Sequence, residues 1–169
     1  LPGVGAFHKG MKALQELELT KTIIKTANRG VPLIGICLGM QMLLDESDEF
    51  EVTDGLGLIS GRVEKFPEIK EKNNYIKIPQ INWHEIVPGI SNISWKNSLL
   101  KEHMSTDSLY FVHSFVARPS NVNHILANYN CYGIKIPALI IKDNIIGCQF
   151  HPEKSGDAGL KILKNFMSM

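Results

Sequence analysis

The 169-residue sequence has almost no charge imbalance and no long uninterrupted apolar run. Eighteen Lys and Arg side chains stand against seventeen Asp and Glu side chains, which leaves a net charge of +1. Without a basic surplus there is no electrostatic attraction for DNA, RNA or an anionic membrane, so we expect no nucleic-acid partner. The longest apolar stretch, residues 31–44, is interrupted by Gly, Pro and Gln41. It falls short of the roughly 18 apolar residues that a membrane-spanning helix needs, and we expect no membrane segment.

Cysteine is scarce as well. Cys37, Cys131 and Cys148 are odd in number and form no disulfide framework, which fits a reducing compartment, so we expect a cytoplasmic protein. The composition is that of an ordinary globular protein, with 44% hydrophobic and 21% charged residues. Because no internal repeat, low-complexity tract or linker interrupts the chain, we predict one domain over residues 1–169. Such a chain can bury roughly 70% of its unfolded surface.

The first third of the sequence has the pattern of an α/β protein. Apolar residues at helical spacing from Met11 to Ala27 predict one amphipathic helix that ends at Gly30. A buried strand over 31–37 and a second helix over 38–46 follow. A helix, a buried strand and a helix in succession are typical of a parallel sheet covered by helices.

The remainder of the sequence predicts mainly strands. Residues 75–87 read as an edge or bent strand because Pro79 lies inside them, and residues 99–104 as a short helix. The last helix begins at Ser155, which can cap it. Further strands are predicted over 109–117, 124–130, 134–141 and 145–150. We therefore predict an α/β fold with a mostly parallel central sheet flanked by helices, and a smaller antiparallel portion.

One cysteine lies in a pattern that suits a nucleophile. Gly35-Ile36-Cys37-Leu38-Gly39 has the order G-x-nucleophile-x-G where a buried strand gives way to a helix. In such an elbow the glycines let the backbone crowd and the strained turn exposes the nucleophile. We expect the helix start to favour the thiolate, and the amide of Leu38 to face a developing oxyanion. The alternative is a buried structural cysteine.

A histidine and a carboxylate form the second pattern. His151 and Glu153 are two residues apart after the last strand, so in extended backbone they lie on one face, and Pro152 keeps the segment out of a helix. The carboxylate can orient the imidazole as a base for Cys37, which predicts a Cys-His-Glu triad at the carboxyl edge of the sheet. The alternative is a strand-end histidine beside a solvated glutamate.

A zinc site is a further alternative. Cys148 and His151, with Cys131 and His124, could supply four ligands, but they lack the two short ligand pairs typical of such sites. We therefore predict no metal and no cofactor.

These motifs together resemble the class I (triad) glutamine amidotransferases, and among them the glutaminase subunits of imidazole glycerol phosphate synthases. The resemblance covers essentially the whole chain. It is carried by the cysteine motif over 35–41, the histidine motif over 147–155, the opening Pro-Gly-Val-Gly over 2–5, and the runs 1–7, 55–63, 110–115 and 163–166. It implies a flavodoxin-like fold.

The resemblance also implies residue roles. Cys37 would attack the carboxamide of glutamine, form a glutamyl thioester and release ammonia, with His151 as general base and then acid, oriented by Glu153. Two further sets are implied. The oxyanion hole would be formed by Val4, Gly5 and Leu38, and the pocket for the amino-acid end of glutamine would be lined by Gln41, His113, Ser114 and Phe115.

Members of this group deliver ammonia through a channel to a (β/α)8-barrel cyclase subunit, so the resemblance implies a heterodimer that makes imidazole glycerol phosphate and aminoimidazole carboxamide ribotide in histidine biosynthesis. This sequence has Trp83-His84 after Pro79-Gln80-Ile81-Asn82, where the family has Pro-x-x-Gly-Trp-Asn. One alternative is therefore a paralogous glutaminase for amidation of a surface-polysaccharide sugar. A separate alternative is a non-catalytic scaffold of the same fold. Because relatives begin with a strand and helix of roughly 30 residues, we expect such a unit to be missing before Leu1.

Overall fold

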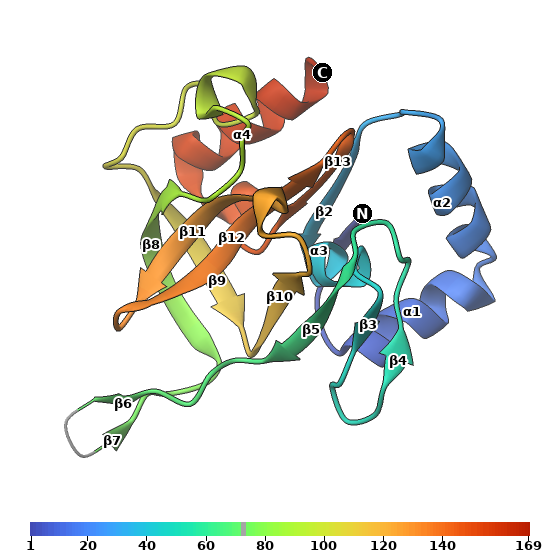
Figure 1. Cartoon of the computed structure of the whole chain (residues 1–169), viewed down its shortest axis with the longest axis horizontal. Coiled ribbons are helices and arrows are strands. Elements are labelled where there is room, and N and C mark those ends of the chain that lie inside the picture. The colour runs from blue at the N-terminus through green and yellow to red at the C-terminus, as the bar shows by residue number, and fades with distance from the viewer. Residues whose placement is uncertain (72–73) are drawn as a thin grey trace.

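The computed structural model describes residues 1–71 and 74–169, and it contains helices packed on a curled, mixed sheet (Figure 1). The helices are α1 (Phe7–Glu16), α2 (Leu19–Asn28), α3 (Leu38–Met42) and α4 (Gly156–Met167), with short 3-10 turns η1 (Trp95–Asn97), η2 (Val122–His124) and η3 (Pro152–Lys154). Within the described ranges no helix is long and apolar enough to cross a membrane.

The large sheet has seven strands in the order β1-β2-β13-β12-β11-β8-β9. Their bounds are β1 Pro2–Gly3, β2 Leu33–Cys37, β13 Ile145–Cys148, β12 Ile134–Lys142, β11 Ile125–Cys131, β8 Gln80–Pro88 and β9 Ser108–His113. A second sheet has the order β10-β5-β3-β4, with β10 Phe115–Pro119, β5 Gly61–Lys65, β3 Glu46–Ser47 and β4 Thr53–Asp54. The strands β6 (Lys70–Glu71) and β7 (Asn74–Tyr75) pair with each other.

The α/β class predicted from the sequence is confirmed, but the parallel part of the sheet is smaller than expected. In the large sheet β1, β2 and β13 run parallel, whereas β12, β11, β8 and β9 pair antiparallel. The reason is local: β11 and β12 are joined by Tyr132-Gly133, and β12 and β13 by Asp143-Asn144. Two-residue connections allow only antiparallel neighbours, because a parallel pair needs a long crossover.

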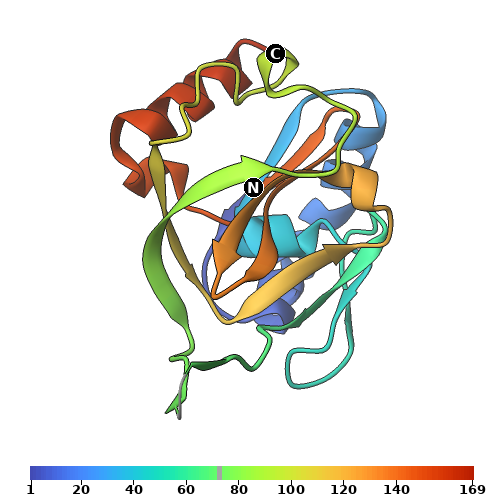
Figure 2. The same cartoon turned by 60° about the vertical axis from the view of Figure 1, so that its left-hand side comes forward.

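Two hydrophobic clusters cover the two faces of the large sheet. Along β12 the pleat sends Ile140 into one cluster, with Phe7, and Leu139 into the other, with Ile162. Phe7 belongs to α1 and Ile162 to α4, so these helices cover opposite faces, as Figure 2 shows. The carboxyl ends of β2 and β13 are thereby held between two buried layers.

The predicted N-terminal helix is wrong in extent, because two helices occupy the segment. The break lies at Glu18, which has a left-handed φ of 56°, and Leu17 is left 67% exposed. A left-handed residue cannot continue an α-helix, so α2 leaves the axis of α1.

Three other expectations are corrected by the topology. The predicted strand over 109–117 is two strands, β9 and β10, that part at Ser114 and enter different sheets. The strand near Pro79 is not an edge: Pro79 precedes β8, which lies between β11 and β9, so the missing proline N–H costs the ladder nothing. No helix forms over 99–104, where the chain makes turns.

Candidate active site

Cys37 lies at the end of β2, where the chain turns sharply into α3. Its φ of 53° and ψ of −109° are unusual for a residue with a side chain, and it precedes the first residue of α3. The flanking glycines are required by packing: a Cβ on Gly35 would lie 2.5 Å from the carbonyl oxygen of Gly39, and a Cβ on Gly39 would overlap the carbonyl oxygen of Leu1. The strained elbow expected from the sequence is therefore present.

The thiol of Cys37 is buried, at 7% exposure of the residue. Burial raises the pKa of this thiol to about 11, although hydrogen bonds from the amide of Leu38 and the side chain of Gln149 pull the pKa down. The amide of Leu38 at the helix start favours the thiolate, as the sequence predicts, but desolvation of the buried thiol outweighs it. The sulfur lies 3.8 Å from the carbonyl oxygen of Val112, to which the thiol donates.

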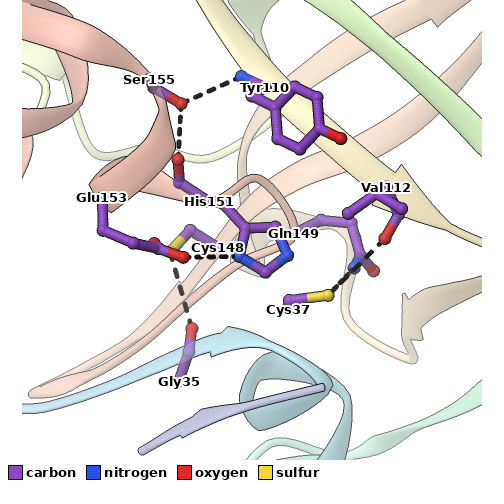
Figure 3. Close-up of polar contacts among 9 residues, drawn as sticks. All are labelled: Gly35, Cys37, Tyr110, Val112, Cys148, Gln149, His151, Glu153 and Ser155. Carbon is purple, nitrogen blue, oxygen red and sulfur yellow. Dashed lines mark hydrogen bonds and ion pairs between the residues drawn. The ribbon is translucent and has the colours of Figure 1, made fainter. Parts of the chain in front are cut away.

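His151 and Glu153 are paired. Nδ1 of His151 lies 2.7 Å from Oε1 of Glu153, and the imidazole is buried while the carboxylate is half exposed. Because a carboxylate accepts, Nδ1 carries the proton and Nε2 has a free lone pair. Within residues 1–71 and 74–169, Nε2 has no hydrogen-bond partner. Figure 3 shows the ring between the carboxylate of Glu153 and the sulfur of Cys37.

The backbone of His151 is fastened to β9. Its amide donates to the carbonyl oxygen of Tyr110 at 2.9 Å, and its carbonyl accepts a 2.6 Å hydrogen bond from the hydroxyl of Ser155. The same hydroxyl accepts from the amide of Tyr110 at 2.9 Å (Figure 3). Ser155 occupies the N-cap position of α4 but makes no side-chain cap, so its predicted role is corrected: it holds the histidine segment instead.

A cavity of about 330 Å³ opens at the cysteine. That volume is at the small end of ligand pockets and suits a molecule of amino-acid size. It is lined by Val4, Gly5, Cys37, Leu38, Gln41, Glu49, Pro79, Val112, His113, Ser114, Phe115 and His151. Every site residue expected from the sequence lines this cavity except Glu153, which lies behind His151 and borders a second cavity of about 220 Å³.

The residues expected to hold an oxyanion lie at the mouth of this cavity. Gly3 pairs with Cys37 across the parallel strands β1 and β2, so the following residues Val4 and Gly5 line the same cavity as Cys37. Gly5 has a φ of 101°, a conformation that favours glycine. Val4 is 77% exposed.

Gln41 and the 113–115 segment form the opposite wall of the cavity. The Nε2 of Gln41 donates to the carbonyl oxygen of Phe115 at 3.2 Å. Nδ1 of His113 lies 2.7 Å from the same oxygen, and its Nε2 lies 2.8 Å from the hydroxyl of Tyr129. Because a carbonyl only accepts, His113 donates through Nδ1 and accepts from Tyr129. Burial lowers the pKa of His113 to about 4, so the ring is neutral.

The sequence prediction missed Glu49 and Gln149, which carry side chains of chemical interest at the site. Glu49 lines the cavity, and its Oε2 accepts a 2.6 Å hydrogen bond from the amide of Phe7. It lies in an acidic stretch whose spacing gives no signal. Gln149 is fully buried and contacts Cys37 and Gln41. Its position two residues before His151 is the signal that could have found it.

The zinc alternative is contradicted by the structure. Nowhere in the described part of the chain do three or more His, Cys, Asp or Glu side chains gather as a metal site, so Cys131, Cys148, His124 and His151 do not come together. The Cys148 thiol contacts the carbonyl oxygen of Gly35 at 3.6 Å, and the Cys131 thiol contacts Gln80. Both cysteines are buried in the core.

A strained cysteine elbow facing a His-Glu pair over a small cavity is an arrangement that can carry out cysteine-dependent acyl transfer. The family model described as glutamine amidotransferase class-I matches residues 1–169. The chain therefore belongs to the class I glutamine amidotransferase family, which confirms the resemblance seen in the motifs.

Within this family, the relatives of the chain are HisH subunits. The chain is 46% identical over 169 residues to imidazole glycerol phosphate synthase subunit HisH 1 of Legionella pneumophila (strain Lens), which covers 100% of the chain and 79% of that protein. It is 42% identical over 169 residues to subunit HisH of a Geobacillus species, and the match covers 100% of the chain and 77% of that protein.

Solved structures agree on the fold. A crystal structure of a glutamine amidotransferase superposes with a TM-score of 0.62 at 19% identity, covering 98% of this chain and 77% of that one. A glutamine amidotransferase from Thermotoga maritima gives a TM-score of 0.59 at 15% identity, and the match covers 99% of this chain and 60% of that one. The glutamine amidotransferase-like fold class is thereby confirmed.

Proposed function

We propose that the protein hydrolyses glutamine with the triad Cys37, His151 and Glu153 and supplies the ammonia to a synthase partner. The observation that carries this proposal is the meeting of the elbow cysteine and the carboxylate-bound histidine in one cavity of amino-acid size. A non-catalytic scaffold would have no need to keep His151 buried with a free Nε2 beside a nucleophile. Membership in the class I glutamine amidotransferase family supports the same conclusion.

The reaction follows from the geometry. Nε2 of His151 takes the proton of the Cys37 thiol, the sulfur attacks the carboxamide carbon of glutamine, and the protonated imidazole then gives its proton to the leaving ammonia. Because burial raises the pKa of the thiol to about 11, this proton transfer is required near neutral pH. Glu153 stabilises the imidazolium through the 2.7 Å hydrogen bond to Nδ1. Water then hydrolyses the thioester with His151 as base.

The cavity walls have the groups that a bound glutamine needs. The amide of Leu38, with Val4 and Gly5, stabilises the oxyanion of the tetrahedral intermediate. The carboxylate of Glu49 keeps one oxygen free of the bond to Phe7 and attracts the α-ammonium group of the substrate. Both Nε2 hydrogens of Gln41 are used within the protein, so its Oε1 is the atom left to accept from the substrate. His113, Ser114 and Phe115 complete this end of the pocket.

The partner and the pathway follow from the relatives. Those relatives are HisH subunits of imidazole glycerol phosphate synthases, and we assign this chain the same place: a heterodimer with a (β/α)8-barrel cyclase in histidine biosynthesis. Amidation of a polysaccharide sugar has no support among these relatives. Three free cysteines fit an assembly that works in the cytoplasm.

The resting geometry supports dependence on the partner. The Cys37 thiol donates to the carbonyl of Val112, and Val4 at the oxyanion loop is 77% exposed. We expect the isolated chain to have little glutaminase activity until a partner orders this loop; full turnover by the isolated chain would contradict this.

The decisive assay measures ammonia released from glutamine by the complex with its nucleotide substrate present. Cys37→Ala abolishes release, while free ammonium restores synthesis because the partner has its own site. Release of ammonia by Cys37→Ala would overturn the assignment of the nucleophile. No turnover by the unaltered complex would overturn the proposed function.

A further inference from the structure

Gln149 is a fully buried amide side chain between the nucleophile and the glutamine pocket. It has no part in the reaction steps assigned to the triad. It follows β13, and its backbone amide donates to the carbonyl of Ala138 at 2.9 Å, which holds the residue in line with the sheet. A buried amide side chain must find partners for its polar atoms. The partners it finds are Cys37 and Gln41.

The backbone carbonyl of Phe115 fixes the direction of each hydrogen bond that links it to Gln41, Gln149 and Cys37. The oxygen of Phe115 only accepts, so the atom of Gln41 at 3.2 Å from it is the nitrogen Nε2. That nitrogen has a second hydrogen, which it donates to Oε1 of Gln149 at 3.1 Å. The remaining end of Gln149 is then its nitrogen, which lies 3.7 Å from the sulfur of Cys37 (Figure 3). Flipping either amide would set two oxygens or two NH₂ groups against each other.

The starting carbonyl is itself fixed. His113 donates to the oxygen of Phe115 through Nδ1 at 2.7 Å and accepts from the hydroxyl of Tyr129 at 2.8 Å. His113 and Tyr129 are 4% and 0% exposed, so this end of the chain of groups is anchored in the core. The anchored carbonyl therefore decides which atom Gln149 presents to the nucleophile.

We propose that Gln149 is a positioning residue for Cys37: its side-chain N–H holds the sulfur in place and stabilises the thiolate, while its oxygen holds Gln41 in the glutamine pocket. When His151 takes the thiol proton, the sulfur keeps the electron pair and Gln149 keeps its hydrogen, so no other group changes protonation. An N–H donor aimed at the sulfur stabilises the thiolate more than the neutral thiol. This proposal rests on the assignment of Cys37 as nucleophile.

The thiol has other charged neighbours, and the test must leave them unchanged. The titratable groups around it are Glu153 and Lys154 of η3, Cys148 of β13, and the cavity residues Glu49, His113 and His151. Glu153 raises the pKa of the thiol, and Lys154 and Gln149 lower it. Replacing Gln149 by methionine removes the donor, keeps a similar side-chain volume and leaves these groups in place.

The experiment measures the rate at which iodoacetamide alkylates Cys37 in the isolated chain as a function of pH, with each cysteine peptide resolved by mass spectrometry. For Gln149→Met the apparent pKa of Cys37 rises by about one unit, so alkylation below that pKa slows about tenfold. Gln149→Glu slows it further, because a carboxylate cannot donate and adds negative charge. A Gln149→Met profile that coincides with that of the unaltered protein overturns the proposal.

The matched control is Gln80→Met. Gln80 is also a buried glutamine in contact with a cysteine, since the Cys131 thiol lies 3.6 Å from its Oε1. This variant leaves the profile of Cys37 unchanged. A shift as large as that of Gln149→Met would assign the effect to general loosening of the core and overturn the proposal. Far-ultraviolet circular dichroism checks that each variant is folded.

A second measurement needs no change at Gln149. In the unaltered protein, the side-chain NH₂ resonances of Gln149 shift with the same apparent pKa as Cys37, and this shift disappears in Cys37→Ala. A titration of Cys37 that leaves these resonances unmoved overturns the proposal. Neither measurement depends on glutaminase activity, so failure of the proposed function and failure of the Gln149 assignment are distinguishable.

Discussion

Acid destabilises the folded protein through His113, and the size of the effect follows from the burial of this imidazole. Burial lowers the pKa of His113 to about 4 in the folded protein, against about 6.5 in the unfolded chain. Between these values the unfolded state binds more protons, so the stabilising contribution is complete above about pH 6.5 and is lost as pH falls towards 4. The pKa difference of about 2.5 units, at 1.36 kcal/mol each, corresponds to about 3 kcal/mol.

The assay is urea unfolding followed by fluorescence, from about pH 7 to about pH 4, for the unaltered chain and for His113→Gln. At neutral pH the variant is less stable by about 1–3 kcal/mol, because Tyr129 and the carbonyl of Phe115 lose a partner. This gap closes in acid, since only the unaltered chain bears the cost of protonating His113. His84 is present in both proteins, so its contribution cancels. Equal losses of stability in the two proteins would refute the reasoning.

Three further predictions concern the elbow, the triad and the pocket. Gly35→Ala forces a Cβ to within 2.5 Å of backbone in Gly39, so it lowers stability by about 1–3 kcal/mol and abolishes glutaminase activity. Chemical denaturation measures the first effect and an ammonia assay the second. An active, equally stable variant would contradict the packing. Glu153→Ala lowers kcat about 10- to 30-fold with little change in KM, because a half-exposed charge-assisted hydrogen bond to His151 is worth about 1.5–2 kcal/mol; an unchanged kcat would exclude an orienting role. Glu49→Gln raises KM for glutamine about tenfold or more, because it removes the cavity carboxylate that we propose attracts the α-ammonium group. Steady-state kinetics showing an unchanged KM would place that group elsewhere.

The meeting of Cys37, His151 and Glu153 could be predicted from the sequence because its signals are local. The glycines around Cys37 indicate a crowded turn, and the two-residue spacing of His151 and Glu153 keeps them close enough to pair. The expected extended backbone is wrong for Glu153, which lies in the 3-10 turn η3. Both motifs follow strands that pair in parallel, β2 and β13, which brings their ends together. The predicted site residues accordingly line one cavity, with Glu153 directly behind it.

The features that escaped prediction depend on tertiary structure. Residues 109–117 have uniform strand character, so nothing local marks the break at Ser114 that turns the chain from one sheet into the other. Glu49 reaches the cavity because its loop closes over the start of α1 at Phe7, 42 residues earlier in the chain. The amide of Leu38 favours the thiolate of Cys37 as the sequence predicts, but the burial that opposes it comes from the tertiary structure.

The assignment of Cys37 as nucleophile is tested most directly by labelling the complex with an electrophilic chloroketone analogue of glutamine and mapping the modified peptides. The geometry predicts that the label attaches to Cys37 alone, that glutamine protects this residue, and that His151→Ala slows the reaction. Modification of Cys131 or Cys148 instead, or labelling of Cys37 that glutamine does not slow, would contradict the assignment.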